Sequence, residues 1–430
     1  MGLLAVVQNK VTRTLFSPER RDKSRRKAEH ARRLSGTPHV VEYFHDASDP
    51  YSHLMAQILP DFCQRYKVEL NVHITAPPPD WAAPDRGRLE SYARIDAERL
   101  ARRAGLIFTD LGHQPSATEL EVANHALLVA LDKDAFLMSA AEIGQRLWAG
   151  RIDALEASTD PDATTRLADA AALRDELGHY LGATLYYAGE WYWGLDRLHH
   201  LERRLQALDA MKADTGRALI YAPADAPTGR AASPPERKPD LHWYLSFRSP
   251  YTAIVGARVK ALADAYGAAL KLRYVLPMVM RGMKVPRKKS FYIMSDVVRE
   301  AERQAIPFGN LVDPVGAPVE RGYAILEAAI QQGRGFEFAQ SFLSGVWAEG
   351  INAGSDRGLK IITERAGLSW ADMKPQLSSE SWRAVAEANR QDMFKYDLWG
   401  VPSFRVDAVA SWGQDRLWVI EDALKSNLDG

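Results

Sequence analysis

The sequence predicts an α/β protein made of two tandem copies of one domain, each with a helical insertion. The chain has 430 residues, which is more than one hydrophobic core usually organises, so two domains are expected. The same residue types recur 200 positions apart in one register, and such a long period indicates two copies of a whole domain rather than short repeats. The identical pairs at this separation include Pro50 and Pro250, Tyr51 and Tyr251, Tyr92 and Tyr292, Asp96 and Asp296, Arg99 and Arg299, and Phe108 and Phe308.

The order of elements is clearest in the second copy, where an aromatic strand, a helix and an alternating second strand follow one another. A βαβ unit of this kind makes its two strands parallel. A helical insertion, a hairpin and a last helix follow, whereas the first copy has lost a segment between Asp153 and Gly182. The expected strands are 242–247, 270–275, 403–406 and 408–410, and the expected helical stretches are 253–266, ended by Gly267, 291–390 and 415–428.

Four segments follow from this organisation. Residues 1–36 form a basic arm, which we expect to be solvated and partly disordered rather than a helix that binds a membrane surface or a partner. Residues 37–221 form the first copy, and residues 241–430 form the second. Residues 222–240 contain five prolines and few large apolar side chains, as expected of an extended linker.

Composition excludes several classes of function. The 55 basic and 55 acidic residues cancel, so no global charge favours nucleic acid as a partner. No apolar run is long enough to span a membrane, and the start of the chain lacks the order of a secretory signal. The single cysteine, Cys63, lies in a helix expected at 52–66 and reads as a small buried residue. With no internal disulfide and no C-x-x-C sequence, a reducing, cytoplasmic location is expected, and no metal site is expected.

Ser249 lies at the turn between the aromatic strand and the helix of the second copy. Pro250 suits the first position of a helix, and Ser249 then suits the N-cap, where its hydroxyl can bond a backbone amide. Capping alone is the ordinary role of this pattern. A hydroxyl at a helix N-terminus is also a favourable place for an anion such as a thiolate.

The second copy resembles a known family, and the resemblance runs from residue 241 to the end of the chain. Its element order is similar to that of DsbA-like proteins, which have a thioredoxin fold with an inserted helical domain. Its particular motifs resemble 2-hydroxychromene-2-carboxylate isomerases and kappa-class glutathione transferases, whereas the first copy resembles them only in outline. The matching motifs are Ser249-Pro250-Tyr251, Tyr292 with Asp296, Arg299 and Ala301, Ile306-Pro307-Phe308, Gly400-Val401-Pro402-Ser403-Phe404, and Trp412-Gly413-Gln414-Asp415-Arg416.

The resemblance implies a glutathione site in the second copy. It implies that the Val401–Pro402 bond is cis and that the Val401 backbone pairs with the cysteinyl unit of glutathione. It also implies that Gln414 and Asp415 bind the γ-glutamyl end, although helix capping explains these two residues equally well. Ser249 would then keep the glutathione thiol ionised, and lowering a thiol pKa by about two units requires roughly 2.7 kcal/mol. The cofactor, rather than a cysteine of the chain, would supply the nucleophile.

The first copy keeps the turn but differs at the residues that would hold the ligand. Asp49 replaces Ser249 and caps a helix equally well, but a carboxylate there would repel a thiolate. Thr184 is aligned with Pro402 in this interpretation. We therefore expect the first copy to be a non-catalytic scaffold.

The helical insertion of the second copy offers weaker candidates for substrate binding: Lys288, Lys289 and Tyr292. The two lysines could hold a carboxylated substrate. Tyr292, Asp296 and Arg299 share one helix face, where an intrahelical ion pair is the favoured interpretation because the same residues recur in the first copy.

The leading hypothesis is a glutathione-dependent isomerase or transferase that acts on a small aromatic or unsaturated acid. The alternatives are a non-catalytic binding or scaffold protein, and glutathione-dependent conjugation or peroxide reduction. A protein disulfide oxidoreductase is disfavoured because the chain has no C-x-x-C sequence. Pairing of the two copies within one chain is compatible with the way in which subunits pair in relatives.

Overall fold

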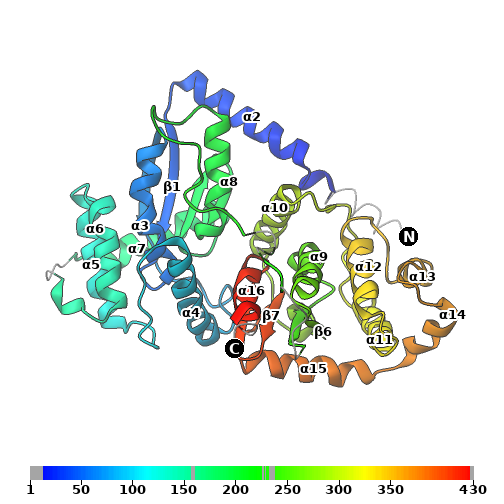
Figure 1. Ribbon diagram of the computed structural model, residues 1–430. Helices are drawn as coiled ribbons and strands as arrows, with labels where there is room; N and C mark the ends of the chain where they lie inside the picture. Colours follow the sequence, from blue (N-terminus) through cyan, green and yellow to red (C-terminus); the bar gives the residue numbers. More distant parts are fainter. Residues whose placement is uncertain (1–12, 156–159, 225–226, 228, 232–237, 427–430) are drawn as a thin grey trace. The chain divides into compact units, whose positions relative to one another are not determined.

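The computed structural model describes the chain except for residues 1–12, 156–159, 225–226, 228, 232–237 and 427–430. Its residues form two compact units. The N-terminal unit is Asp22–Pro223, and the C-terminal unit is Ala224–Gly430 together with Met1–Arg21. Each unit contains one four-stranded sheet and its own helices (Figure 1).

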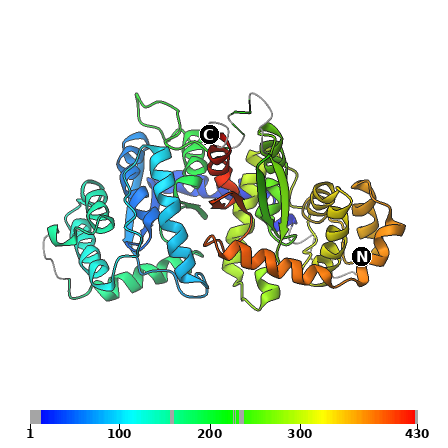
Figure 2. The same cartoon turned by 60° about the horizontal axis from the view of Figure 1, so that its bottom comes forward.

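The boundary between the two units lies within α2 (Pro18–Ser35), because Arg21 belongs to the C-terminal unit and Asp22 to the N-terminal unit. The helices α5 (Ala117–Asp132) and α6 (Phe136–Trp148), coloured cyan to teal, lie together beside the sheet of the N-terminal unit (Figure 2). Its further elements are β1 (His39–His45), α3 (Pro50–Arg65), β2 (Val68–Ile74), α4 (Arg86–Ala104), α5 (Ala117–Asp132), α6 (Phe136–Trp148), η1 (Ile152–Ala154), α7 (Ala163–Glu176), β3 (Thr184–Tyr187), β4 (Glu190–Trp193) and α8 (Gly194–Ala207).

The C-terminal unit has the predicted order of strand, helix, strand, helical insertion, hairpin and helix. The insertion runs from α10 (Arg287–Arg303) to α15 (Ser381–Phe394). The elements are β5 (Asp240–Leu245), α9 (Pro250–Ala265), β6 (Ala269–Tyr274), η2 (Met278–Arg281), α10 (Arg287–Arg303), α11 (Ala317–Gln331), α12 (Gly335–Trp347), α13 (Asp356–Arg365), α14 (Trp370–Met373), η3 (Lys374–Ser378), α15 (Ser381–Phe394), β7 (Ser403–Val406), β8 (Val409–Trp412), η4 (Gln414–Arg416) and α16 (Leu417–Ser426).

The two sheets have the same strand order and the same pairing directions. The orders are β2-β1-β3-β4 and β6-β5-β7-β8. In each sheet the first βαβ unit pairs its strands in parallel, as predicted, and the other two contacts are antiparallel. The carboxyl ends of the parallel strands therefore lie at the same edge of each sheet, where the following helix begins.

The strand register corrects one prediction, the alignment of Thr184 with Pro402. Thr184 pairs with Phe44, and Ser403 pairs with the matching residue Tyr244, so Thr184 corresponds to Ser403. The residue that corresponds to Pro402 is then Ala183, and the residue that corresponds to Val401 is Gly182. The predicted alignment was wrong by one residue. The segments before the two hairpins differ in length, and the alignment had matched Gly182 with Gly400 because both are glycine.

The insertion of the C-terminal unit is fixed to the strand that leads to Ser249. The Phe247 ring stacks on Phe342 of α12 with ring centroids 4.0 Å apart, and the Trp347 indole donates a hydrogen bond of 3.0 Å to the Phe247 carbonyl. The Tyr323 hydroxyl of α11 donates to the Val275 carbonyl at 2.6 Å. All of these rings are buried, so the end of β5 and the turn that follows it rest on a packed aromatic core.

The prediction of a partly disordered basic arm is wrong for residues 18–35, which form α2. Pro18 follows Ser17, whose hydroxyl accepts a hydrogen bond from the Arg20 amide at 3.2 Å, so this helix starts with a capped turn. Glu29 pairs with both Arg32 and Arg33 one turn later, which offsets part of the repulsion among the basic residues. The predicted linker lies partly outside the described residues.

No helix in the described part of the chain combines the length and the apolar character that a membrane span requires. Cys63 lies in α3, as predicted, but it is half-buried rather than fully buried. Burial raises the pKa of its thiol to about 11, so this thiol is not ionised at neutral pH.

Candidate active site

Ser249 connects the start of α9 to the loop that precedes β7. Its hydroxyl oxygen accepts a hydrogen bond from the Thr252 amide at 3.2 Å, which makes Ser249 the N-cap that the sequence predicts. The same hydroxyl donates its one proton to the Val401 carbonyl, with an oxygen–oxygen distance of 3.3 Å. Ser249 is half-buried, so the helix tip and the Val401 carbonyl meet where part of the serine side chain is accessible.

The Val401–Pro402 bond is cis, as the resemblance implies. The Pro402 carbonyl accepts a hydrogen bond of 2.9 Å from the Gly413 amide, so the turn before Gln414 lies beside this proline. Within the part of the chain that the structure describes, the Val401 amide has no hydrogen-bond acceptor, and Val401 is half-buried. The structure thus brings Ser249, Val401, Pro402 and the 413–414 turn together around a backbone amide that has no acceptor among the described residues.

Gln414 is placed differently from Ser249, because its side chain is buried inside the unit. Its amide nitrogen donates to Glu300 at 3.1 Å, and its carbonyl oxygen accepts hydrogen bonds from Arg258 and, at 3.4 Å, from Gln304. The Gln414 amide nitrogen also donates to Asp415. The side chain of Gln414 is therefore engaged by protein groups, whereas Asp415 is half-buried at the start of the last helical segment.

Sequence reasoning missed Arg258, Glu300 and Gln304, which hold Gln414. A signal existed: the residues 200 positions earlier are Ile58, Leu100 and Ala104, so the second copy has polar groups where the first has apolar ones. Glu300 is 1% exposed and forms an ion pair of 2.8 Å with Arg303, so its carboxylate is compensated although it is buried.

Lys289 lies near the loop that leads to Val401. Its ammonium nitrogen is 6.0 Å from the centroid of the Trp399 ring, which in turn contacts Trp412 with ring centroids 5.2 Å apart. Burial lowers the pKa of Lys289. Lys288 and Tyr292 occupy the same helix, α10, where Lys288 is half-buried and Tyr292 is buried. Lys289 is therefore connected to the loop through the Trp399 ring.

The predicted intrahelical ion pair of α10 is confirmed. Arg299 contacts Asp296 at 3.0 Å, and both side chains are buried. Asp296 also accepts a hydrogen bond of 2.7 Å from the hydroxyl of Tyr251, in the first turn of α9. In the N-terminal unit, Tyr51 and Asp96 make the same contact at 2.8 Å, which indicates a structural role for this pair.

The corresponding turn of the N-terminal unit has a different chemistry. Asp49 caps α3 by accepting a hydrogen bond of 3.0 Å from the Tyr51 amide. Burial, followed by the nearby charge of Asp46, raises the pKa of Asp49 to about 8, so the expected repulsion of a thiolate is weak at neutral pH. A Cβ atom at Gly182 would lie 2.6 Å from the Asp46 side chain and 3.0 Å from Asp49. The turn of the N-terminal unit is thus closely packed around Gly182, which is buried, whereas its counterpart Val401 is half-buried.

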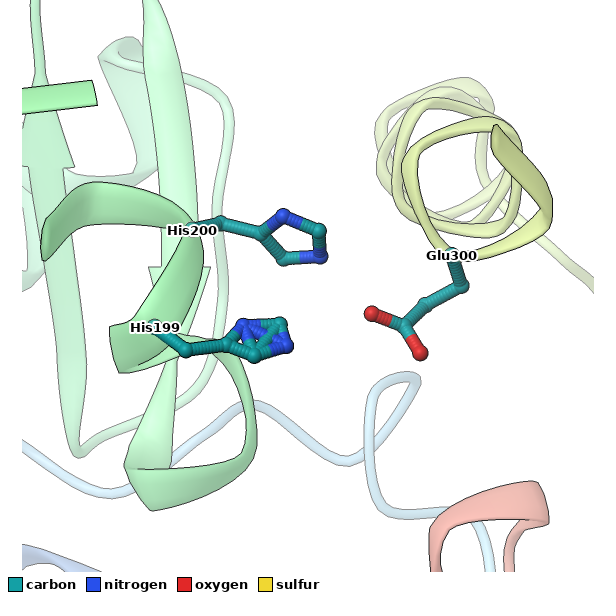
Figure 3. A group of neighbouring side chains, drawn as sticks. All are labelled: His199, His200 and Glu300. Atoms are coloured by element: carbon teal, nitrogen blue, oxygen red, sulfur yellow. The ribbon is translucent and has the colours of Figure 1, made fainter. Parts of the chain in front are cut away.

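Three side chains carry atoms that metal ions commonly bind, His199, His200 and Glu300, and they are drawn in Figure 3. His199 and His200 belong to α8 of the N-terminal unit, where their rings are 4.1 Å apart in an edge-on arrangement. Glu300 belongs to α10 of the C-terminal unit and forms the ion pair with Arg303. The three side chains belong to two different units, so they do not define a metal site within either unit.

Comparisons with known proteins match the C-terminal unit. Residues 240–425 match the family model of the DSBA-like thioredoxin domain, and the match covers one such domain. The 2-hydroxychromene-2-carboxylate isomerase of Pseudomonas putida is 22% identical over 192 residues, which are 43% of this chain and 93% of that protein. The isomerase of Pseudomonas sp. (strain C18) is also 22% identical, over 43% of this chain and 89% of its own length.

Two solved structures are similar to part of the chain. A 2-hydroxychromene-2-carboxylate isomerase has a TM-score of 0.38 and 21% identity, covering 43% of this chain and 94% of its own. The cytosolic disulfide reductase DsbM from Pseudomonas aeruginosa with GSH has a TM-score of 0.35 and 18% identity, covering 44% of this chain and 97% of its own.

Proposed function

Proceeding from the DSBA-like thioredoxin domain of residues 240–425, we propose that the C-terminal unit is a glutathione-dependent isomerase or transferase of the 2-hydroxychromene-2-carboxylate isomerase type. One observation carries the proposal: the Ser249 hydroxyl lies 3.3 Å from the Val401 carbonyl, beside a Val401 amide without an acceptor among the described residues. The distant isomerase relatives support the reaction class. The substrate in this proposal is a small aromatic or unsaturated acid.

The Val401 backbone has the two groups that a strand-like ligand requires, an amide donor and a carbonyl acceptor. Its carbonyl accepts the Ser249 proton in the free protein. An N–H group of a bound peptide can replace Ser249 at this carbonyl. Ser249 then directs its proton to the ligand sulfur, while its oxygen still accepts the Thr252 amide and caps α9. Binding and activation of the thiol are thus coupled through one hydroxyl.

Bound glutathione supplies the thiolate nucleophile for isomerisation of a conjugated double bond. Ser249 stabilises the anion as a hydrogen-bond donor, and the N-terminus of α9 adds the favourable end of the helix dipole. The network of Arg258, Glu300 and Gln414 positions the 413–415 turn, where Asp415 and the backbone amides are the groups proposed for the γ-glutamyl end. Lys289 is the residue proposed for a carboxylate of the substrate.

We also infer that the N-terminal unit is a degenerate copy of the same domain, so that residues 37–221 and 241–430 are two tandem thioredoxin-like domains. The common strand order and the matched contacts of Tyr51 with Asp96 and Tyr251 with Asp296 support this inference. Asp49 and the closely packed Gly182 replace the two groups that would engage glutathione. The N-terminal unit is accordingly a non-catalytic scaffold in this proposal.

Calorimetric titration of the full chain with reduced glutathione tests the proposal. We expect saturable binding at one site per chain, and weaker binding of a glutathione analogue whose thiol is replaced by a methyl group. The variant Asp49→Asn is the matched control, because it changes the equivalent helix cap in the other unit and should leave affinity unchanged. Absence of binding at millimolar glutathione would remove the enzymatic proposal. Binding without turnover of any unsaturated acid would favour a glutathione-binding scaffold.

A further inference from the structure

The N-terminal unit places two acidic side chains where the C-terminal unit has Ser246 and Ser249. Asp46 follows β1 directly, and Asp49 caps α3. One carboxylate oxygen of Asp46 accepts hydrogen bonds from the Ser48 amide at 2.9 Å and from the Ser48 hydroxyl at 2.7 Å. Its other oxygen is buried and has no hydrogen-bond partner in the described part of the chain. Burial raises the pKa of both carboxyl groups.

Arg174 of α7 lies near the same edge of the sheet. Its guanidinium donates a hydrogen bond of 3.2 Å to the Ala76 carbonyl, just beyond β2. The neighbouring Thr75 amide donates to the His45 carbonyl at 2.8 Å, so Ala76 lies beside the point where Asp46 begins. Arg174 is 2% exposed, and its charge is attracted by those of Asp46 and Asp49.

These opposite charges do not pair directly. Among the described residues, the Nε and Nη1 atoms of Arg174 are buried and have no acceptor. An arginine carries five donors in a fixed fork, and buried polar groups are almost always hydrogen-bonded. An acidic oxygen without a donor and a guanidinium without enough acceptors therefore share one buried region. A molecule that has both an acceptor and a donor would satisfy both.

We propose that the N-terminal unit binds a small zwitterion of the amino-acid class, with its carboxylate on the fork of Arg174 and its ammonium against the free carboxylate oxygen of Asp46, beside the Asp49 carboxyl. A guanidinium fork matches a carboxylate, and an ammonium supplies a donor to the Asp46 oxygen that lacks one. The carboxyl edge of an open α/β sheet is the usual place for such ligands. The proposal concerns the other unit and does not depend on glutathione binding at Ser249.

Thermal unfolding and calorimetry of the full chain test this site with glycine and L-glutamate as probes. Acetate and methylammonium are the controls, since each carries only one of the two charges. We expect saturable binding of at least one zwitterion and no binding of the single ions. Asp46→Asn and Arg174→Lys should each weaken binding about tenfold or more, because Asn removes the negative charge and Lys removes the fork while keeping the positive charge.

A control variant in the C-terminal unit tests whether the zwitterion binds in the N-terminal unit. The variant Ser249→Ala should leave zwitterion binding unchanged, because Ser249 belongs to the C-terminal unit. Circular dichroism confirms that each variant is folded, and Asp46→Asn remains informative if Arg174→Lys does not fold. Failure of the wild-type chain to bind any zwitterion would overturn the proposal and leave ordered water as the bridge. Binding that neither substitution weakens would overturn it as well.

Discussion

Replacing Ser249 with alanine separates the two roles of its hydroxyl. The substitution removes the acceptor of the Thr252 amide, and loss of such an N-cap costs about 1 kcal/mol of stability. It also removes the donor that we assign to the glutathione sulfur. A hydrogen bond to a charged group contributes about 1.5–3 kcal/mol, which corresponds to roughly one to two pKa units. The pKa of the bound thiol should therefore rise by at least about one unit in Ser249→Ala.

The assay is a pH titration of the ultraviolet absorbance of the thiolate, with the protein saturated by reduced glutathione. Ser355→Ala is a closely matched control in the same unit. The Ser355 hydroxyl accepts a hydrogen bond from the Gly358 amide at 3.1 Å and donates to the Asn352 carbonyl at 2.9 Å, as Ser249 does with Thr252 and Val401. The control should lose similar stability and leave the pKa of the bound thiol unchanged.

The result that refutes this reasoning is an equal thiol pKa in the wild type and in Ser249→Ala. Ser249 would then be a helix cap alone. A shift of the same size in Ser355→Ala would refute it too, because the effect would arise from lost stability rather than from contact with the sulfur.

Three further predictions concern single side chains. Burial raises the pKa of Asp49 from 3.8 to about 8. The stability that its bound proton provides is therefore complete below about pH 4 and is lost as the pH rises to about 8. Urea unfolding of Asp49→Asn should lack this decline in stability, and an unchanged decline would contradict the assignment to Asp49. Glu300→Gln should lower the free energy of unfolding by about 3 kcal/mol, since it removes the buried carboxylate charge that pairs with the guanidinium of Arg303. The exposed control Glu364→Gln should cost less than about 1 kcal/mol, and equal losses would argue against the buried network. Lys289→Met should raise KM for a carboxylated substrate about tenfold without changing glutathione affinity, whereas Lys260→Met, on the surface, should change neither; steady-state kinetics decides, and equal effects would exclude a role for Lys289.

Local signals in the sequence were sufficient for the elements that build the site. The apolar strand, the Ser249-Pro250 start of α9 and Gly267 at its end each reflect chemistry within a few residues, and the structure has all three. The intrahelical pair of Asp296 and Arg299 followed from their spacing for the same reason. The cis bond before Pro402 followed from the resemblance and not from the local sequence.

The features that sequence reasoning missed depend on contacts between distant residues. Gln414 is held by side chains of α9 and α10, and no spacing within its own segment predicts those partners. The pKa of Asp49 depends on burial and on Asp46 rather than on its role as a cap. The one-residue slip at Thr184 arose because the register of a strand is set by its neighbours in the sheet.

Hydrogen exchange of single backbone amides, followed by nuclear magnetic resonance, tests most directly whether the C-terminal unit offers the Val401 backbone to a peptide. The account predicts that the Val401 amide exchanges rapidly in the free protein and slowly once reduced glutathione is bound, while the Gly182 amide is unaffected by glutathione. A Val401 amide that exchanges at the same rate with and without saturating glutathione would contradict the account.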